Sequence, residues 1–209
     1  MLHCSPGRVR GRMTRTLAFL VMLALTLTAG SATASPAGPP SFQRTVRGHV
    51  VQVPIPPDAR AAGTYPNAQA YEMRLADRAG HAQLEIELRV GASDQKVPQN
   101  DTELRQAFLS IIHSTRLPIR DDQIHISIVD NVNTAFRVAY AGIFPFRAKS
   151  GKVVYLSLGV MVSRHKDFVV PILALGGMVS SSATPKEINL AQRYLAGMMV
   201  SMIRGSSVR

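Results

Sequence analysis

Two aspartates and a histidine, Asp121, Asp122 and His125, have the spacing closest to a metal-binding cluster. Carboxylates and imidazoles bind divalent cations, although zinc sites generally draw on further histidine or cysteine ligands. The alternation around Ile124 and Ile126 places His125 on the opposite face of a strand, with the aspartates before it in a loop. A surface histidine at the start of a strand accounts for the same pattern. We therefore expect no metal ligand here, and keep a hydrolase or metal-dependent enzyme as the alternative.

A second group of reactive side chains, His165 and Asp167, stands between Arg164 and Lys166 in a charged segment. A catalytic triad needs a nucleophile and a buried base, which an exposed hairpin tip does not supply. The sequence contains neither G-x-S-x-G nor H-E-x-x-H, and no glycine-rich phosphate loop opens a helix. We expect no catalytic residue and no cofactor.

The charged segment joins two apolar strands within residues 152–177. One face of the first strand carries Val154, Leu156, Leu158, Val160 and Val162. Its other face carries small or apolar residues, and the return strand, 168–175, has no charge. Strands that are apolar on both faces lie in the middle of a sheet and are covered on both sides.

The second face of this strand is the candidate binding groove. It consists of Tyr155, Ser157, Gly159 and Met161. Ser157 and Gly159 leave shallow relief into which either a ligand or the last helix of the chain could fit. A methionine-rich last helix, with Met198, Met199 and Met202, suits an adaptable groove but equally suits core packing.

The first 34 residues have the features of a secretory signal peptide. Four arginines precede an apolar run, Leu17–Leu27, and Ala32-Thr33-Ala34 fits a signal-peptidase site. The start is at Met1 or at Met13. We expect cleavage between Ala34 and Ser35, then a flexible linker at 35–41 and a single α/β domain at 42–205, with no transmembrane span after cleavage.

The single cysteine, Cys4, would be removed with this segment, leaving no disulfide. Such a domain suits the bacterial periplasm or exterior. The net charge of +11 falls on cleavage, because the signal peptide carries arginines and no acidic residue. The remaining positive charge favours another envelope protein or an anionic surface as partner, and the sequence shows no dense basic run for specific nucleic-acid binding.

The remaining segments predict the elements that surround the central strands. We expect a strand at 45–55, a loop at 58–70, a hairpin at 71–76 and 83–90, a helix at 100–115, strands at 124–128 and 134–144, a loop at 176–183 and a closing helix at 184–205. The two helices begin with Asn100 and Thr184, each three residues before a glutamate, which is a capping-box spacing.

This order of elements, with a helix before a long meander and a closing helix TPKEINLAQRYLAGMMVSMI, resembles the PsbP-like α/β/α sandwich over residues 42–204. The expected fold is α+β, with an antiparallel sheet of about six to seven strands packed by two main helices. The resemblance implies a non-catalytic binding or accessory protein of the cell envelope, of which a chaperone-like or toxin-neutralising protein is a special case. It transfers no site residue.

Overall fold

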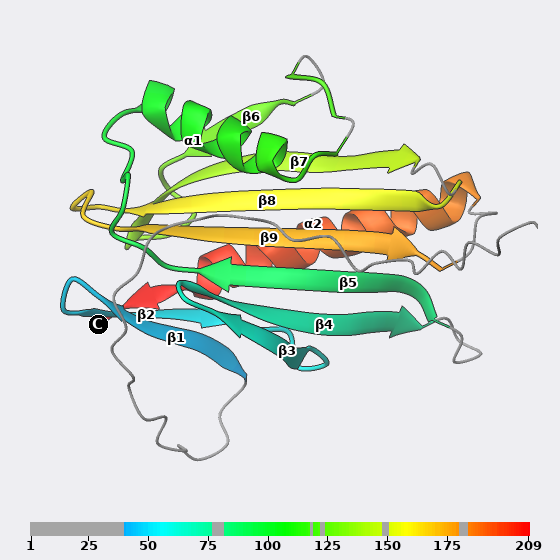
Figure 1. The fold of residues 1–209 in the computed structure, drawn as a ribbon, viewed down its shortest axis with the longest axis horizontal. Helices are drawn as coiled ribbons and strands as arrows, with labels where there is room; N and C mark the ends of the chain where they lie inside the picture. The colour runs from blue at the N-terminus through cyan, green and yellow to red at the C-terminus, as the bar shows by residue number, and fades with distance from the viewer. Residues whose placement is uncertain (1–39, 77–81, 118, 122–123, 148–150, 180–183) are drawn as a thin grey trace, which may run out of the picture.

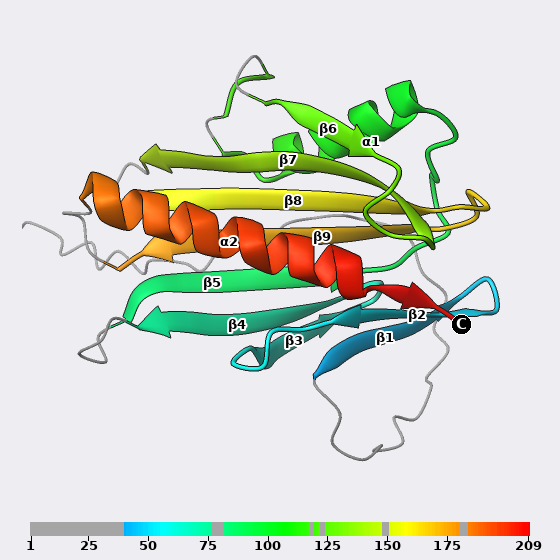
Figure 2. The same ribbon diagram turned by 180° about the vertical axis from the view of Figure 1, so that it is seen from behind.

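The computed structural model describes residues 40–76, 82–117, 119–121, 124–147, 151–179 and 184–209. A large antiparallel sheet lies between two helices, α1 (Asp101–Ser114) and α2 (Pro185–Gly205), one on each face (Figures 1 and 2). The predicted α+β class, a sheet with two main helices, is confirmed. The predicted signal peptide, and the linker up to residue 39, lie outside the described residues.

The large sheet has seven strands, and every neighbouring pair is antiparallel. Their order across the sheet is β3 (Arg60–Tyr65), β4 (Ala68–Ala76), β5 (Ala82–Gly91), β9 (Val169–Met178), β8 (Val153–Ser163), β7 (Phe136–Arg147) and β6 (Ile126–Val129). The two strands predicted to be central, β8 and β9, do lie inside the sheet, and β8 is buried along almost its whole length. The hairpin predicted at 71–76 and 83–90 is confirmed as β4 and β5.

A second, three-stranded sheet consists of β1 (Ser41–Val46), β2 (His49–Pro54) and β10 (Ser207–Val208), in the order β1-β2-β10. The prediction of one continuous strand at 45–55 is wrong, because the chain turns back at Arg47 and Gly48. Both residues have positive φ angles, 52° and 81°, as tight two-residue hairpin turns require. Val51 and Val53 are nonetheless fully buried, as the alternation predicted.

The segment predicted as a loop, 58–70, contains strand β3 and the start of β4. The sequence of β3, RAAGTY, has no apolar alternation, and most of its residues are exposed. Its strand conformation comes from pairing with β4, which leaves β3 at the edge of the sheet.

Helix α2 covers β7, β8 and β9 and also contacts β2 of the small sheet (Figure 2). The hydroxyl of Thr184 accepts a hydrogen bond from Glu187 N, and the Glu187 carboxylate accepts one from Thr184 N, which is the predicted capping box. Its buried stripe consists of Ala191, Leu195, Met198, Met199, Met202 and Ile203. None of the helices in the described part of the chain has both the length and the apolar composition needed to cross a bilayer.

Helix α1 covers a smaller area on the opposite face, over β7 and β8 (Figure 1). It buries Leu104, Phe108 and Ile112 against the aliphatic row of β8 that the sequence predicted. On the same face, β9, β5 and β4 have no helix over them among the described residues. We call this area the open half of the sheet.

The open half is partly apolar and partly charged. Leu173 and Leu175 of β9 are half-buried. Beside them, Arg74 of β4 pairs with Glu85 of β5 at 3.1 Å. The charged residues that alternate along both strands predicted that the outward face of the β4–β5 hairpin is solvated. The exposed charges on both strands confirm this prediction.

Strand β9 continues through Gly176, Gly177 and Met178. The predicted loop at 176–183 is therefore wrong for its first residues, and residues 180–183 lie outside the described part of the chain. Gly176 faces α2, where an added Cβ would lie 3.2 Å from Leu84 and 3.3 Å from Leu195. A glycine at this position lets the helix approach the sheet closely.

Candidate functional site

The predicted groove formed by Tyr155, Ser157, Gly159 and Met161 is not a groove in the structure. The side chains of Tyr155, Ser157 and Met161 are 0% exposed. A Cβ added to Gly159 would lie 3.1 Å from Ile203 Cδ1 and 3.2 Å from Met199 Sδ. The face lies under α2 and belongs to the core, so the groove hypothesis is wrong at this position.

Of the three predicted metal ligands, the structure describes Asp121 and His125. Asp121 lies against His113, at the end of α1, with 2.6 Å between Asp121 Oδ1 and His113 Nε2. His125 is exposed just before β6, and Asp122 lies outside the described residues. No group of three potential ligands occurs in the part of the chain that the structure describes. Because Asp122 is not among the described residues, a hydrolase or metal-dependent enzyme built on Asp121, Asp122 and His125 stays a hypothesis.

A cavity of about 320 Å³ lies where the tip of the β8–β9 hairpin meets the start of α1. It is lined by Pro98, Gln99, Asn100, Leu104, Asp130, Arg137, Val162, Ser163, Arg164 and Lys166. A second cavity of about 300 Å³ is lined by Arg47, Asp94, Val97, Gln99, Lys166 and Asp167. Gln99 and Lys166 line both cavities, and we call the pair of cavities the divided cleft.

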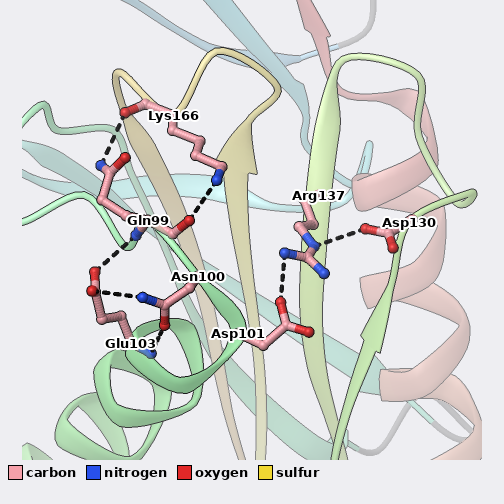
Figure 3. A network of polar contacts seen from close by, with 7 residues as sticks. All are labelled: Gln99, Asn100, Asp101, Glu103, Asp130, Arg137 and Lys166. Atoms are coloured by element: carbon pink, nitrogen blue, oxygen red, sulfur yellow. Dashed lines mark hydrogen bonds and ion pairs between the residues drawn. The ribbon is translucent and has the colours of Figure 1, made fainter.

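Two hydrogen bonds join Gln99 and Lys166, the residues that line both parts of the cleft (Figure 3). Lys166 Nζ donates to the carbonyl oxygen of Gln99 at 2.5 Å, and Gln99 Nε2 donates to the carbonyl oxygen of Lys166 at 3.3 Å. Lys166 has a positive φ of 58°, an unfavourable conformation for a lysine. The tight turn thus brings both its ammonium group and its carbonyl group to Gln99.

The N-terminus of α1 forms one wall of the cleft and is capped by its own side chains (Figure 3). Asn100 Oδ1 accepts a hydrogen bond from Glu103 N at 2.9 Å. The Glu103 carboxylate accepts from Gln99 N and from Asn100 Nδ2, at 2.9 and 2.8 Å. The predicted capping role of Asn100 is confirmed. The free N–H groups that attract anions to helix N-termini are thus already partly satisfied.

Arg137 on β7 joins this wall to the neighbouring turn (Figure 3). Its Nη1 lies 2.5 Å from Asp101 Oδ1, and its Nε donates to Asp130 Oδ1 at 2.8 Å. The Arg137 side chain is only 29% exposed, and each carboxylate is about half exposed, at 52%. Arg137 therefore positions α1 on the sheet, and its charge is matched by two acids.

Arg164 and Lys166 differ from Arg137 in their partners. Arg164 Nη2 donates to the carbonyl oxygens of Asp130 and Asn133. Lys166 donates to the Gln99 carbonyl oxygen, and neither cation belongs to an ion pair of the described residues. The uncompensated positive charge of the cleft is therefore at these two side chains.

Asp167 borders the second cavity and accepts a hydrogen bond from the Ser163 hydroxyl. Its other oxygen lies 3.5 Å from His49 Nε2, on β2. This order differs from a catalytic triad, in which the histidine stands between the serine and the acid. Burial tends to raise the pKa of Asp167, but the hydrogen bond from Ser163 and other favourable contacts outweigh it and lower the pKa. The carboxylate is consequently a weak base for activating Ser163.

The spacing Ser163-x-x-Lys166 also occurs in hydrolases that pair a serine with a lysine. Here the two side chains have different partners: Lys166 Nζ donates to Gln99 and the Ser163 hydroxyl donates to Asp167. Ser163 is therefore not paired with the lysine base that such hydrolases use.

The sequence pointed to the charged tip but not to the cleft. Arg164 to Asp167 were recognised as exposed charges at a hairpin turn. Gln99 and Arg137 carried no signal, because a glutamine before a helix and an arginine in a strand are ordinary residues. Only the pairing of β7 with β8 and the packing of α1 bring them to the tip.

The fold and the site together define a three-layer α+β protein with a divided cleft at one end of its central hairpin. The chain matches no protein-family model and no curated protein.

Proposed function

We propose that this chain is a non-catalytic binding or accessory protein of the bacterial cell envelope, periplasmic or secreted, which recognises its partner through the divided cleft. A chaperone-like or toxin-neutralising protein would belong to this class. The observation that carries the proposal is the cleft itself, in which Arg164 and Lys166 donate hydrogen bonds to carbonyl oxygens and form no ion pair with the described residues. Cavities that combine an apolar floor with a few convergent polar groups are typical binding sites.

Two further features support a binding role over catalysis. The Ser163 hydroxyl is engaged with a carboxylate of lowered pKa. The charged groups of Arg137, Asp101 and Asp130 are joined to one another in a fixed arrangement. Such a network gives a rigid wall for recognition but holds no free acid–base pair.

The envelope location rests on the signal-peptide pattern of residues 1–34. Intact mass spectrometry of protein from the envelope fraction tests it, and the expected mature N-terminus is Ser35. A retained Met1 or Met13 in protein from the cytoplasmic fraction would contradict it.

Photo-crosslinking in the native cells tests the recognition site. His165 is exposed between Arg164 and Lys166, while Arg193 is exposed on α2. With p-benzoylphenylalanine in place of His165 we expect a discrete adduct with an envelope component. The same group in place of Arg193 provides the matched control. Adducts of equal yield at both positions, or none at His165, would contradict a binding role for the cleft.

A further inference from the structure

We infer that the ligand of the divided cleft is an acidic peptide segment, whose carboxylate side chains bind Arg164 and Lys166. This inference rests on the proposed binding function and specifies its partner. It concerns a segment of another protein, because the two cavities are lined by cations together with apolar and amide groups.

The charges of the first cavity favour a carboxylate. Three cations and one carboxylate, Asp130, line it. Arg137 is matched by its own acids, so a ligand would meet the remaining charge at Arg164 and Lys166. Both of these now donate to neutral carbonyl oxygens. A carboxylate would form shorter and stronger charge-assisted bonds with the same donors.

Binding at Lys166 would also change the shape of the cleft. Lys166 and Gln99, which line both cavities, are joined by the bond from Lys166 Nζ to the Gln99 carbonyl oxygen. A ligand carboxylate that takes over the ammonium group would break this bond and leave the longer bond from Gln99 Nε2, at 3.3 Å, whose breaking would join the cavities. Both residues are exposed, so their side chains can move without opening the core.

The joined cleft fits an extended chain. Leu104 and Val162 supply an apolar floor in the first cavity, and Val97 does so in the second. The side-chain amides of Gln99 and Asn100 can bond to peptide groups. An extended segment with alternating acidic and apolar residues would place carboxylates on the cations and apolar side chains on this floor.

The acids around the cleft argue against a phosphate polymer. Asp130 lies in the first cavity, and Asp94 and Asp167 lie in the second. They would repel the closely spaced charges of a polyphosphate chain, whereas separated single carboxylates can avoid them.

Fluorescence anisotropy with the purified chain tests the inference. The probe is a fluorescein-labelled peptide, Glu-Val-Glu-Leu-Glu-Ala, and its reference is the same peptide with glutamine for glutamate. The cleft variant is Arg164→Gln with Lys166→Gln, and the control is Lys186→Gln with Arg193→Gln, two exposed positions of α2 with the same loss of charge. If the double variant is less stable because the Arg164 hydrogen bonds are lost, the single variant Lys166→Gln takes its place in the measurement.

We expect the cleft variant to bind the acidic peptide at least tenfold more weakly, the control variant to match the native chain, and the glutamine peptide not to bind. Added salt should weaken binding. Equal binding by both variants, no binding by the native chain, or stronger cleft-dependent binding of sodium polyphosphate would overturn the inference. If the His165 adduct persists in such a case, the proposed function stands and only the ligand class is wrong. If the adduct is absent, the proposed function fails.

Discussion

Asp167 shows how single residues set the electrostatics of the hairpin tip. Burial tends to raise its pKa, but the Ser163 hydroxyl, its own backbone N–H, and the charges of His49 and His165 together lower it from 3.8. A carboxylate with a lowered pKa stabilises the fold above its unfolded pKa. That contribution is lost as the pH falls through the folded value.

Replacing Ser163 with alanine removes the main contact that favours the charged form. We expect Ser163→Ala to lower the free energy of unfolding by about 1 kcal/mol at pH 7, a low value for a bond to a charged group because the carboxylate is partly solvated. The loss should shrink at acid pH, as Asp167 becomes protonated in the folded state. Urea unfolding at the two pH values measures it, and Ser127→Ala on the exposed side of β6 is the control. An equal loss at both pH values would count against this account.

Tyr155, in contrast to Asp167, has a buried polar group without a hydrogen-bond partner among the described residues. Its side chain is 0% exposed, and its hydroxyl has no hydrogen-bond partner among the described residues. Burial raises the pKa of the hydroxyl, which stays neutral. An unpaired buried hydroxyl costs about 1–3 kcal/mol.

Tyr155→Phe should therefore raise the free energy of unfolding by about 1 kcal/mol, because it removes the unpaired group and keeps the ring. Thermal melts and urea unfolding of the variant check this. Tyr65→Phe, on an exposed side chain of β3, should leave stability unchanged. A clear loss of stability in Tyr155→Phe would show that the hydroxyl is bonded in solution.

At the scale of elements, the sequence predicted what local signals specify. The N-caps Asn100 and Thr184, each followed by an apolar stripe at helical spacing, were sufficient to predict both helices. The β1–β2 turn was missed because Arg47, a residue that rarely has positive φ, occupies it. Strand β3 was missed because its pairing with β4, rather than its own pattern, makes it a strand.

The candidate site was beyond the reach of the sequence for a similar reason. Gln99 and Lys166 are 67 positions apart, and no local rule connects them. The wrongly predicted groove depended on which helix lies over which face of β8. Alternation shows which residues share a face, but not which layer covers it.

The C-terminal end of α2 is held by Asn133, which is buried with 8% exposure in the loop before β7. Its side-chain amide donates to the carbonyl oxygens of Ile203 and Ser206, at 2.7 and 2.8 Å. Its oxygen accepts from Ala135 N at 2.8 Å. One side chain thus ties the end of the helix to the sheet.

Asn133→Ala should lower the free energy of unfolding by about 2–3 kcal/mol, because several buried groups lose their partner at once. Hydrogen exchange should speed up most in the last turn of α2 and in β10. Asn131→Ala, at an exposed position of the same turn, is the matched control. A similar small effect in both variants would mean that the helix end is held by other contacts.

At the scale of the whole molecule, the two faces of the sheet differ in how closely they are covered. Gly159 faces α2 at close range, whereas a Cβ at Gly177 would have no atom within 4 Å. We expect Gly159→Val to lower the free energy of unfolding by about 1–3 kcal/mol through overpacking. Gly177→Val should be neutral. Urea unfolding of both variants measures this, and equal tolerance of valine would mean that α2 does not pack closely on β8.

Because β9 lies between β5 and β8, the large sheet cannot be completed on the ribosome until β9 has been synthesised. β5 ends at Gly91 and β8 ends at Ser163, while β9 begins only at Val169. Until β9 is available, β5 and β8 each have an unpaired side that can join a strand of another molecule. The last strand of the large sheet to be synthesised also joins its two halves, so a chain interrupted before Val169 would be a seed for aggregation.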